Sequence, residues 1–162
     1  WLAVAQARVV GVNFLLSIMA LIWAADIFAY FAGRTWGGAL VGVKLAPSIS
    51  PGKSWEGVAG GLVGVLLLAL TWRWADGFGA AVVPSWYSQV AAQGWGLWLL
   101  CVVFMLVMSV VGDLMESLVK RSAGVKDSSG LLPGHGGVLD RIDALLPTLP
   151  LAMMLHTLVV AA

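Results

Sequence analysis

The fold class is decided by the stretch WGLWLLCVVFMLVMSVVG (Trp95–Gly112), which contains no charged residue. A helix that crosses a bilayer needs about 20 mostly apolar residues, within a range of roughly 17–25. Three further uncharged stretches of similar length lie on either side of it, at residues 9–25, 57–72 and 144–162. The sequence therefore predicts an all-α polytopic membrane protein with about four transmembrane helices.

The segment Gly77–Gly94 is also uncharged, but it is rich in Gly, Ser and Gln. We interpret it as an interfacial loop or short helix, with a fifth, partial span as the alternative. Glycines recur in the second uncharged stretch, at Gly57, Gly60, Gly61 and Gly64. Small residues allow close helix contact in lipid, so we expect these glycines to pack helices rather than to bind a ligand.

Composition supports this fold class. Of the 162 residues, 60% are hydrophobic and 10% are charged, and the mean hydropathy is +0.96. A soluble domain carries about 25% charged residues, and disorder requires low hydrophobicity. Cys101 alone cannot form an intramolecular disulfide, and a net charge of +1 argues against a nucleic acid partner. We expect one domain over residues 1–162, and we interpret the start at Trp1 as that of the C-terminal part of a longer chain.

Basic residues predict the orientation in the membrane. Seven of the nine lie in the two loops that follow the first and third spans: Arg34, Lys44, Lys53, Lys120, Arg121, Lys126 and Arg141. Only Arg8 and Arg73 lie elsewhere. The positive-inside rule places both loops on the cytoplasmic side.

Acidic residues gather beside the same two loops. Seven of the eight do so: Asp26, Glu56, Asp113, Glu116, Asp127, Asp140 and Asp143. Asp113, Glu116, Ser117 and Lys120 follow the spacing i, i+3, i+4 and i+7, which places them on one face of a helix that continues the third span. The plain alternative is a helix end with an ordinary Glu116–Lys120 ion pair. The polar stripe begins about two turns before Lys120, however, and ionisable residues at a membrane span usually mark a functional site.

The two loops also carry the residues expected of a phosphate site. Pro133-Gly-His-Gly-Gly137 cannot form a regular helix, and glycine N–H groups let a phosphate approach closely. His135 is interpreted as a phosphate donor, an acid–base group or a plain loop residue. Carboxylates combined with Lys and Arg indicate a Mg²⁺–polyphosphate site. In the first loop, the turn Ser50–Lys53 delivers a lysine, and Ser54 is expected to cap the next helix.

The segment SLVKRSAGVKDSSGLLPGHGGVLDRID (Ser117–Asp143) resembles the signature of the phosphatidate cytidylyltransferase family, also called CDP-diacylglycerol synthases. Gly112-Asp113 and the segments 26–34 and 50–57 resemble other motifs of that family, with Ser54 where threonine is common. The resemblance implies that CTP and phosphatidate give CDP-diacylglycerol and pyrophosphate. It also implies a Mg²⁺ requirement, with room for a monovalent cation such as K⁺, a homodimer, and a bacterial inner membrane with the site facing the cytoplasm.

The same resemblance implies roles for individual residues. Asp113 and Asp140 would hold the metal, and together with Lys120 and His135 they form the predicted catalytic group. The predicted phosphate-binding residues are Lys53, Arg34, Ser117, Arg121, Lys126 and Arg141. The predicted polar shell consists of Asp26, Glu116, Asp127 and Asp143.

Three alternatives remain beside this hypothesis. An ion-coupled transporter would place acids near mid-membrane on several spans, whereas here the acids gather at one face. A related membrane enzyme, such as a polyprenol kinase or a CTP-dependent enzyme acting on another lipid, shares the reaction logic but differs in the lipid. A structural scaffold leaves the polar stripe without a purpose.

Overall fold

The computed structural model is helical, with one short hairpin, and it describes residues 1–79, 82–125, 127–131 and 137–160. Its elements are α1 (Leu2–Val10), α2 (Val12–Trp36), β1 (Lys44–Ala46), β2 (Ser50–Ser54), α3 (Trp55–Asp76), α4 (Trp86–Ala91), α5 (Trp95–Ser122), α6 (Leu139–Ile142) and α7 (Leu145–Leu155). A π-helical turn, His156–Val160, follows α7. The predicted all-α membrane class is confirmed.

Three helices are long and apolar enough to cross a membrane: α2, α3 and α5. Of the predicted fourth span, residues 144–162, the described apolar helix covers Leu145–Val159. At 1.5 Å per residue that helix spans about 22 Å, less than the roughly 30 Å hydrocarbon layer. It contains Pro150, and α6 takes up the residues just before it.

The predicted limits of the first span, residues 9–25, were wrong. The helix is interrupted at Gly11, between α1 and α2, where an added Cβ would lie 3.0 Å from Val83. Helix α2 then runs without interruption to Trp36. Helix α5 continues past the uncharged stretch that ends at Gly112 as far as Ser122, as the polar stripe predicted. Both helices therefore carry ionisable residues that the search for charge-free stretches left outside the spans.

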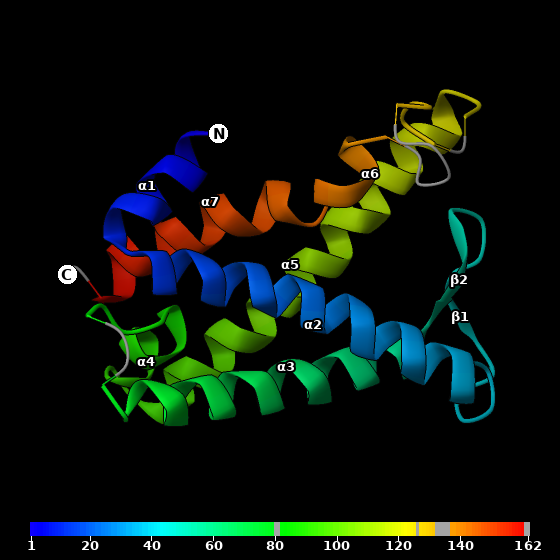
Figure 1. Cartoon of the computed structure of the whole chain (residues 1–162). Helices are drawn as coiled ribbons and strands as arrows, with labels where there is room; N and C mark the ends of the chain where they lie inside the picture. The colour runs from blue at the N-terminus through cyan, green and yellow to red at the C-terminus, as the bar shows by residue number, and fades with distance from the viewer. Residues whose placement is uncertain (80–81, 126, 132–136, 161–162) are drawn as a thin grey trace.

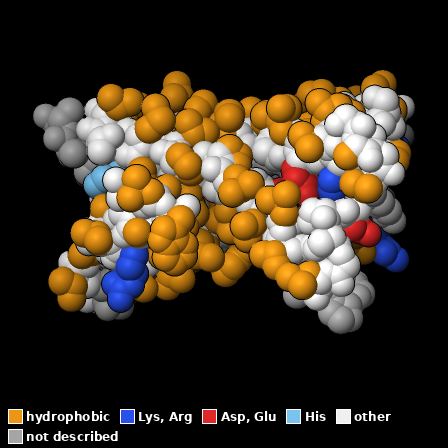
Figure 2. All heavy atoms as spheres, turned by 90° about the horizontal axis from the view of Figure 1, so that it is seen from above, with side chains coloured by type: hydrophobic (Ala, Val, Ile, Leu, Met, Phe, Trp, Pro, Cys, Tyr) orange, Lys and Arg blue, Asp and Glu red, His pale blue; other side chains and the backbone are white. Residues whose placement is uncertain are grey.

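The hairpin and the C-terminal end of α5 lie at one end of the molecule, and α4 lies at the other (Figure 1). Helices α2 and α3 run side by side and antiparallel, and the hairpin connects them. On the face seen in Figure 2, hydrophobic side chains cover most of the surface, and the visible acidic side chains lie together at one end, beside basic ones. The polar groups of the site are thus concentrated at the end that carries the hairpin.

The core forms where α2, α4 and α5 meet. Phe14 and Ile18 of α2, Trp86 and Tyr87 of α4, and Met105 of α5 are fully buried. Helix α4 has only six residues, so the predicted fifth span does not form in the described part of Gly77–Gly94, and the short-helix interpretation is confirmed.

Asp76 fixes α4 at the end of α3. Its carboxylate accepts hydrogen bonds from Ser85 N at 2.9 Å, Ser88 Oγ at 2.6 Å and Asn13 Nδ2 at 2.9 Å. Trp72 Nε1 donates to Asn13 Oδ1 at 2.9 Å, which closes a network between α2, α3 and α4. This role could not be predicted from the sequence, because the hydrogen-bond partners of Asp76 are scattered along the chain.

Candidate active site

The N-terminus of α3 places Lys53 and Ser54. Strands β1 and β2 pair antiparallel, with Lys44 opposite Ser54, and β2 leads directly into α3. Ser54 Oγ accepts a hydrogen bond from Gly57 N at 3.1 Å, which confirms the predicted cap. The cap fixes the point at which the strand becomes a helix, and thereby fixes Lys53 one residue earlier.

The polar stripe of α5 faces this turn. Helix α5 is continuous through Asp113, Glu116, Ser117 and Lys120, as predicted. Asp113 Oδ2 forms an ion pair with Lys53 Nζ, and Ser117 Oγ lies 3.5 Å from Asp113 Oδ1. The ion pair joins the end of β2, just before α3, to α5.

A cavity of about 500 Å³ opens beside this ion pair. Its polar lining includes Asp26, Arg34, Lys53, Ser54 and Asp113, and its apolar walls include Ala25, Ala29, Val58, Leu106 and Val110. Arg34 Nη1 donates to Tyr30 Oη at 2.9 Å at the exposed side. Four predicted site residues from α2, β2 and α5 therefore line one amphipathic cavity.

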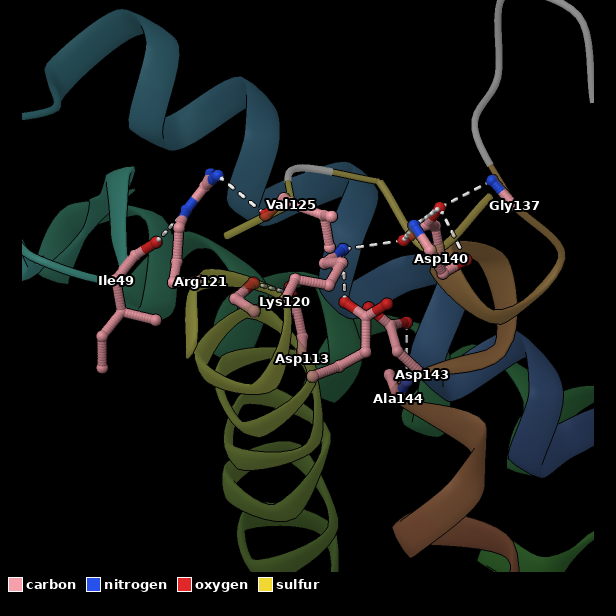
Figure 3. A network of polar contacts seen from close by, with 12 residues as sticks. Ile49, Asp113, Lys120, Arg121, Val125, Gly137, Asp140, Asp143 and Ala144 are labelled. Carbon is pink, nitrogen blue, oxygen red and sulfur yellow. Dashed lines mark hydrogen bonds and ion pairs between the residues drawn. The ribbon is translucent and has the colours of Figure 1, made fainter. Parts of the chain in front are cut away.

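Lys120 lies in a second cluster, which joins α5 to α6. Its Nζ is 2.5 Å from Glu116 Oε2 and 2.7 Å from Asp140 Oδ1 (Figure 3). Both partners are predicted site residues, and the Glu116–Lys120 pair is the one that the helical spacing suggested. The link to Asp140 brings the end of the glycine-rich segment against α5.

Asp140 is the most fully hydrogen-bonded carboxylate of the site. Besides Lys120, it accepts from Ser128 N at 3.0 Å, Ser128 Oγ at 3.0 Å and Gly137 N at 2.6 Å. The hydrogen bond from Lys120, followed by that from Gly137 N, holds the pKa of Asp140 well below its usual range. This carboxylate is therefore ionised and gathers two backbone segments around itself.

Asp143 lies at the start of α7. Its Oδ1 accepts from Ala144 N at 2.7 Å, and its side chain is partly buried. Burial raises the pKa of Asp143, and the negative charge of Asp113 acts in the same direction. An added Cβ at Gly112 would lie 3.3 Å from Asp143 O, so the backbone of Asp143 lies against α5 beside Asp113.

Other predicted residues lie away from the cavity or outside the described residues. Arg121 is exposed; its Nε donates to Ile49 O at 3.4 Å and its Nη1 to Val125 O at 3.5 Å (Figure 3). Asp127 is exposed. Lys126 and His135 lie outside the described residues, as does the side chain of Arg141.

Glu56 holds the segment after α2 beside the start of α3, a contact that the sequence analysis did not predict. The residue is 4% exposed, and its Oε1 accepts from Leu40 N at 3.2 Å and Val41 N at 2.9 Å. It therefore ties the chain that leaves α2 to the first turn of α3. An acid two residues after the capping serine was the available signal, but its distant backbone partners could not be predicted.

The donor set is suited to a hard cation bound together with phosphate. Among the described residues, no three or more His, Cys, Asp or Glu side chains are arranged to hold a metal ion by themselves. Mg²⁺ is usually held by one or two carboxylates together with substrate phosphates. Asp113 and Asp140 provide two carboxylates with lysines as neighbours, so these residues fit that chemistry.

Comparison with known proteins agrees with the geometry. The chain matches the Cytidylyltransferase family over residues 1–159. Phosphatidate cytidylyltransferase of Haemophilus influenzae is 46% identical over 140 residues, which cover 86% of this chain and 44% of the relative. The protein of the same name in Bacillus subtilis is 38% identical over 148 residues, covering 91% of this chain and 49% of the relative.

The chain belongs to the cytidylyltransferase family. It spans about half the length of the curated relatives that it matches. The matched region contains all three long helices and both polar clusters described above.

Proposed function

We propose that this chain carries the catalytic part of a phosphatidate cytidylyltransferase, which transfers CMP from CTP to phosphatidate. A phosphate oxygen of phosphatidate attacks the α-phosphorus of CTP, a new P–O bond forms, and the bond to the β-phosphate breaks. The products are CDP-diacylglycerol and pyrophosphate. The observation that carries the proposal is the amphipathic cavity, which is lined by both charged side chains and apolar helix faces.

The nucleophile of this reaction is already present on the substrate. No activated serine or cysteine is needed, so catalysis reduces to bringing two anions together and stabilising charge at phosphorus. Lys53 provides a cation at the cavity, and Arg34 provides a second one at its exposed side. We propose that these two residues bind phosphate, and that Ser117, Lys120, Arg121, Lys126, Arg141 and His135 complete the phosphate contacts.

We propose Asp113 and Asp140 as the residues that would hold Mg²⁺, with room nearby for a monovalent cation such as K⁺. When bound, Mg²⁺ would neutralise the triphosphate and favour departure of pyrophosphate. Asp26, Glu116, Asp127 and Asp143 would form the surrounding polar shell. Asp113 is already placed against Lys53, so this carboxylate and the phosphate-binding ammonium are neighbours.

The position of the site suits one water-soluble and one lipid substrate. We propose a bacterial inner-membrane location with the polar end facing the cytoplasm, because seven of nine basic residues lie in the two loops at that end. CTP would then arrive from water, and phosphatidate from the bilayer. A homodimer is the assembly that we propose from the family resemblance.

The test is CMP transfer by the full-length protein in lipid nanodiscs, with CTP labelled at the α-phosphate, phosphatidate and Mg²⁺. Label should pass to a CDP-lipid. Asp113→Asn or Asp140→Asn should abolish turnover while the protein still inserts. Asp76→Asn, a matched acid-to-amide change at the far end of α3, should retain activity per folded molecule.

Two results would count against the proposal. Absence of any CDP-lipid with the wild-type protein would remove the enzymatic function, and near-normal activity of Asp113→Asn would remove the metal assignment. A panel of phosphorylated lipids in the same assay would reveal a preference for a lipid other than phosphatidate.

A further inference from the structure

Glu116 is a nearly buried carboxylate in the last third of α5. Its side chain is 8% exposed, and its Oε2 lies 2.5 Å from Lys120 Nζ. Within the described part of the chain, neither carboxylate oxygen has a hydrogen-bond partner besides this ion pair. The negative charge of Glu116 is therefore balanced by the Lys120 ammonium.

Lys120 in turn connects Glu116 to Asp140. The three side chains are 8%, 17% and 11% exposed, so water solvates this array only weakly. A lysine ammonium stands on a flexible four-carbon stem and can adopt many positions. A fixed carboxylate four residues earlier on the same helix restricts it to one of them.

Asp140 in turn binds the backbone at Ser128 and at Gly137. It accepts from Ser128 N, Ser128 Oγ and Gly137 N, which belong to two separate backbone segments (Figure 3). A chain of contacts thus runs from the rigid helix α5, through Glu116, Lys120 and Asp140, to residues on both sides of the glycine-rich stretch. Among these three side chains, Asp140 makes the contacts with the two backbone segments, and Glu116 acts on them through Lys120.

We propose that Glu116 is a positioning residue, which holds Lys120 against Asp140 and so fixes the backbone at Ser128 and Gly137 on the end of α5. The proposal rests on the proposed function for its catalytic consequence, since Asp140 must lie at a defined place relative to Asp113. Its structural consequence, protection of the backbone around Ser128 and Gly137, does not depend on the reaction.

Hydrogen exchange of the full-length protein in nanodiscs without nucleotide measures that structural consequence. In Glu116→Gln, peptides covering residues 127–131 and 137–139 should exchange about tenfold faster, because their N–H acceptor Asp140 is less well held. Met115→Gln is the matched control, since it introduces the same amide at the neighbouring position, where the side chain is 56% exposed. Peptides of α2 and α3 should be unchanged in both variants, which reports correct folding.

Two substitutions of Lys120 test the same contact from its other side. Lys120→Met should accelerate exchange of the same peptides, whereas Lys120→Arg, which retains the charge and the reach, should restore most of the protection.

In the CMP-transfer assay, Glu116→Gln should lower kcat about tenfold and change the KM for CTP by less than about twofold, as expected for an effect on geometry rather than on substrate binding.

The results separate this proposal from the proposed function. Exchange in Glu116→Gln equal to that in Met115→Gln would overturn the positioning role, whatever the activity. Faster exchange in Glu116→Gln, together with no CMP transfer by the wild-type protein, would retain the positioning role and reject the proposed reaction. A large rise in the KM for CTP with unchanged exchange would show that Glu116 acts on the nucleotide instead.

Discussion

Replacing Gly60 with alanine should push α2 and α3 apart. A Cβ added at Gly60 would overlap the methyl group of Ala32 and would lie 3.1 Å from Phe28 O. Carbon atoms pack at about 3.5–4.0 Å, and a methyl group attached directly to the backbone cannot rotate away. The two helices would therefore have to separate, which would weaken the interface that also bounds the cavity.

The expected loss follows from two opposing terms. Overpacking a well-packed contact costs about 1–3 kcal/mol, whereas replacing glycine by alanine inside a helix recovers about 1 kcal/mol. We expect Gly60→Ala to lower the free energy of unfolding by up to about 2 kcal/mol, and a bulkier valine to lower it further. Gly96→Ala is the matched control, because Gly96 also lies in a helix and an added Cβ there meets no atom within 4 Å.

The assay is unfolding in mixed micelles with increasing SDS, followed by circular dichroism. Gly96→Ala should unfold at the same SDS fraction as the wild-type protein or at a higher one, and Gly60→Ala at a lower one. Equal midpoints for the two variants would refute the close contact between α2 and α3. Gly61 offers an intermediate case, since an added Cβ there would lie 3.0 Å from Ala25 O.

Three further predictions concern the carboxylates. Asp76→Ala should lower the unfolding free energy by about 1–3 kcal/mol, because it leaves the buried donor Ser85 Oγ without this acceptor; SDS unfolding measures the loss. Glu56→Ala should release two backbone N–H groups and speed hydrogen exchange of residues 38–43, with Glu56→Gln retaining most of the protection because its amide oxygen still accepts. The lowered pKa of Asp140 stabilises the folded state above the ordinary carboxyl pKa of about 3.9, and this contribution is lost as the pH falls through the folded-state value; wild-type stability should therefore drop more steeply on acidification than that of Asp140→Asn.

The fold class could be predicted from the sequence because lipid imposes a simple rule on composition. Long apolar stretches were enough to locate all three long helices. The end of α2 was misplaced because charge was used as the boundary. Asp26 and Arg34 line the cavity instead of facing lipid, so α2 could continue past both of them. A charged residue ends a hydrophobic stretch in the sequence, but it ends a helix only where no polar surroundings are available.

Local contacts within the site could be predicted, and distant ones could not. Helical spacing was enough to anticipate the Glu116–Lys120 pair, and the serine before α3 was enough to anticipate the cap. The ion pair between Lys53 and Asp113 joins residues sixty positions apart and depends on how α3 packs against α5. Helical periodicity contains no information about that packing. Sequence reasoning could therefore identify Lys53 and Asp113 as site residues, but it could not predict that they form an ion pair.

The cost of burying charge explains why these distant pairs exist. An isolated ionised side chain in an apolar environment is strongly unfavourable, so a carboxylate on a membrane helix requires a cation or several N–H donors beside it. Asp113 has Lys53, Glu116 has Lys120, and Asp140 has Lys120 together with backbone donors. Lys120 forms ion pairs with two carboxylates at once. Its removal therefore leaves two buried negative charges facing each other, whereas removal of the Glu116 charge leaves a Lys120–Asp140 pair with no net charge. Lys120→Met should therefore destabilise the end of α5 more than Glu116→Gln does, and should accelerate hydrogen exchange at residues 127–131 and 137–139 more strongly.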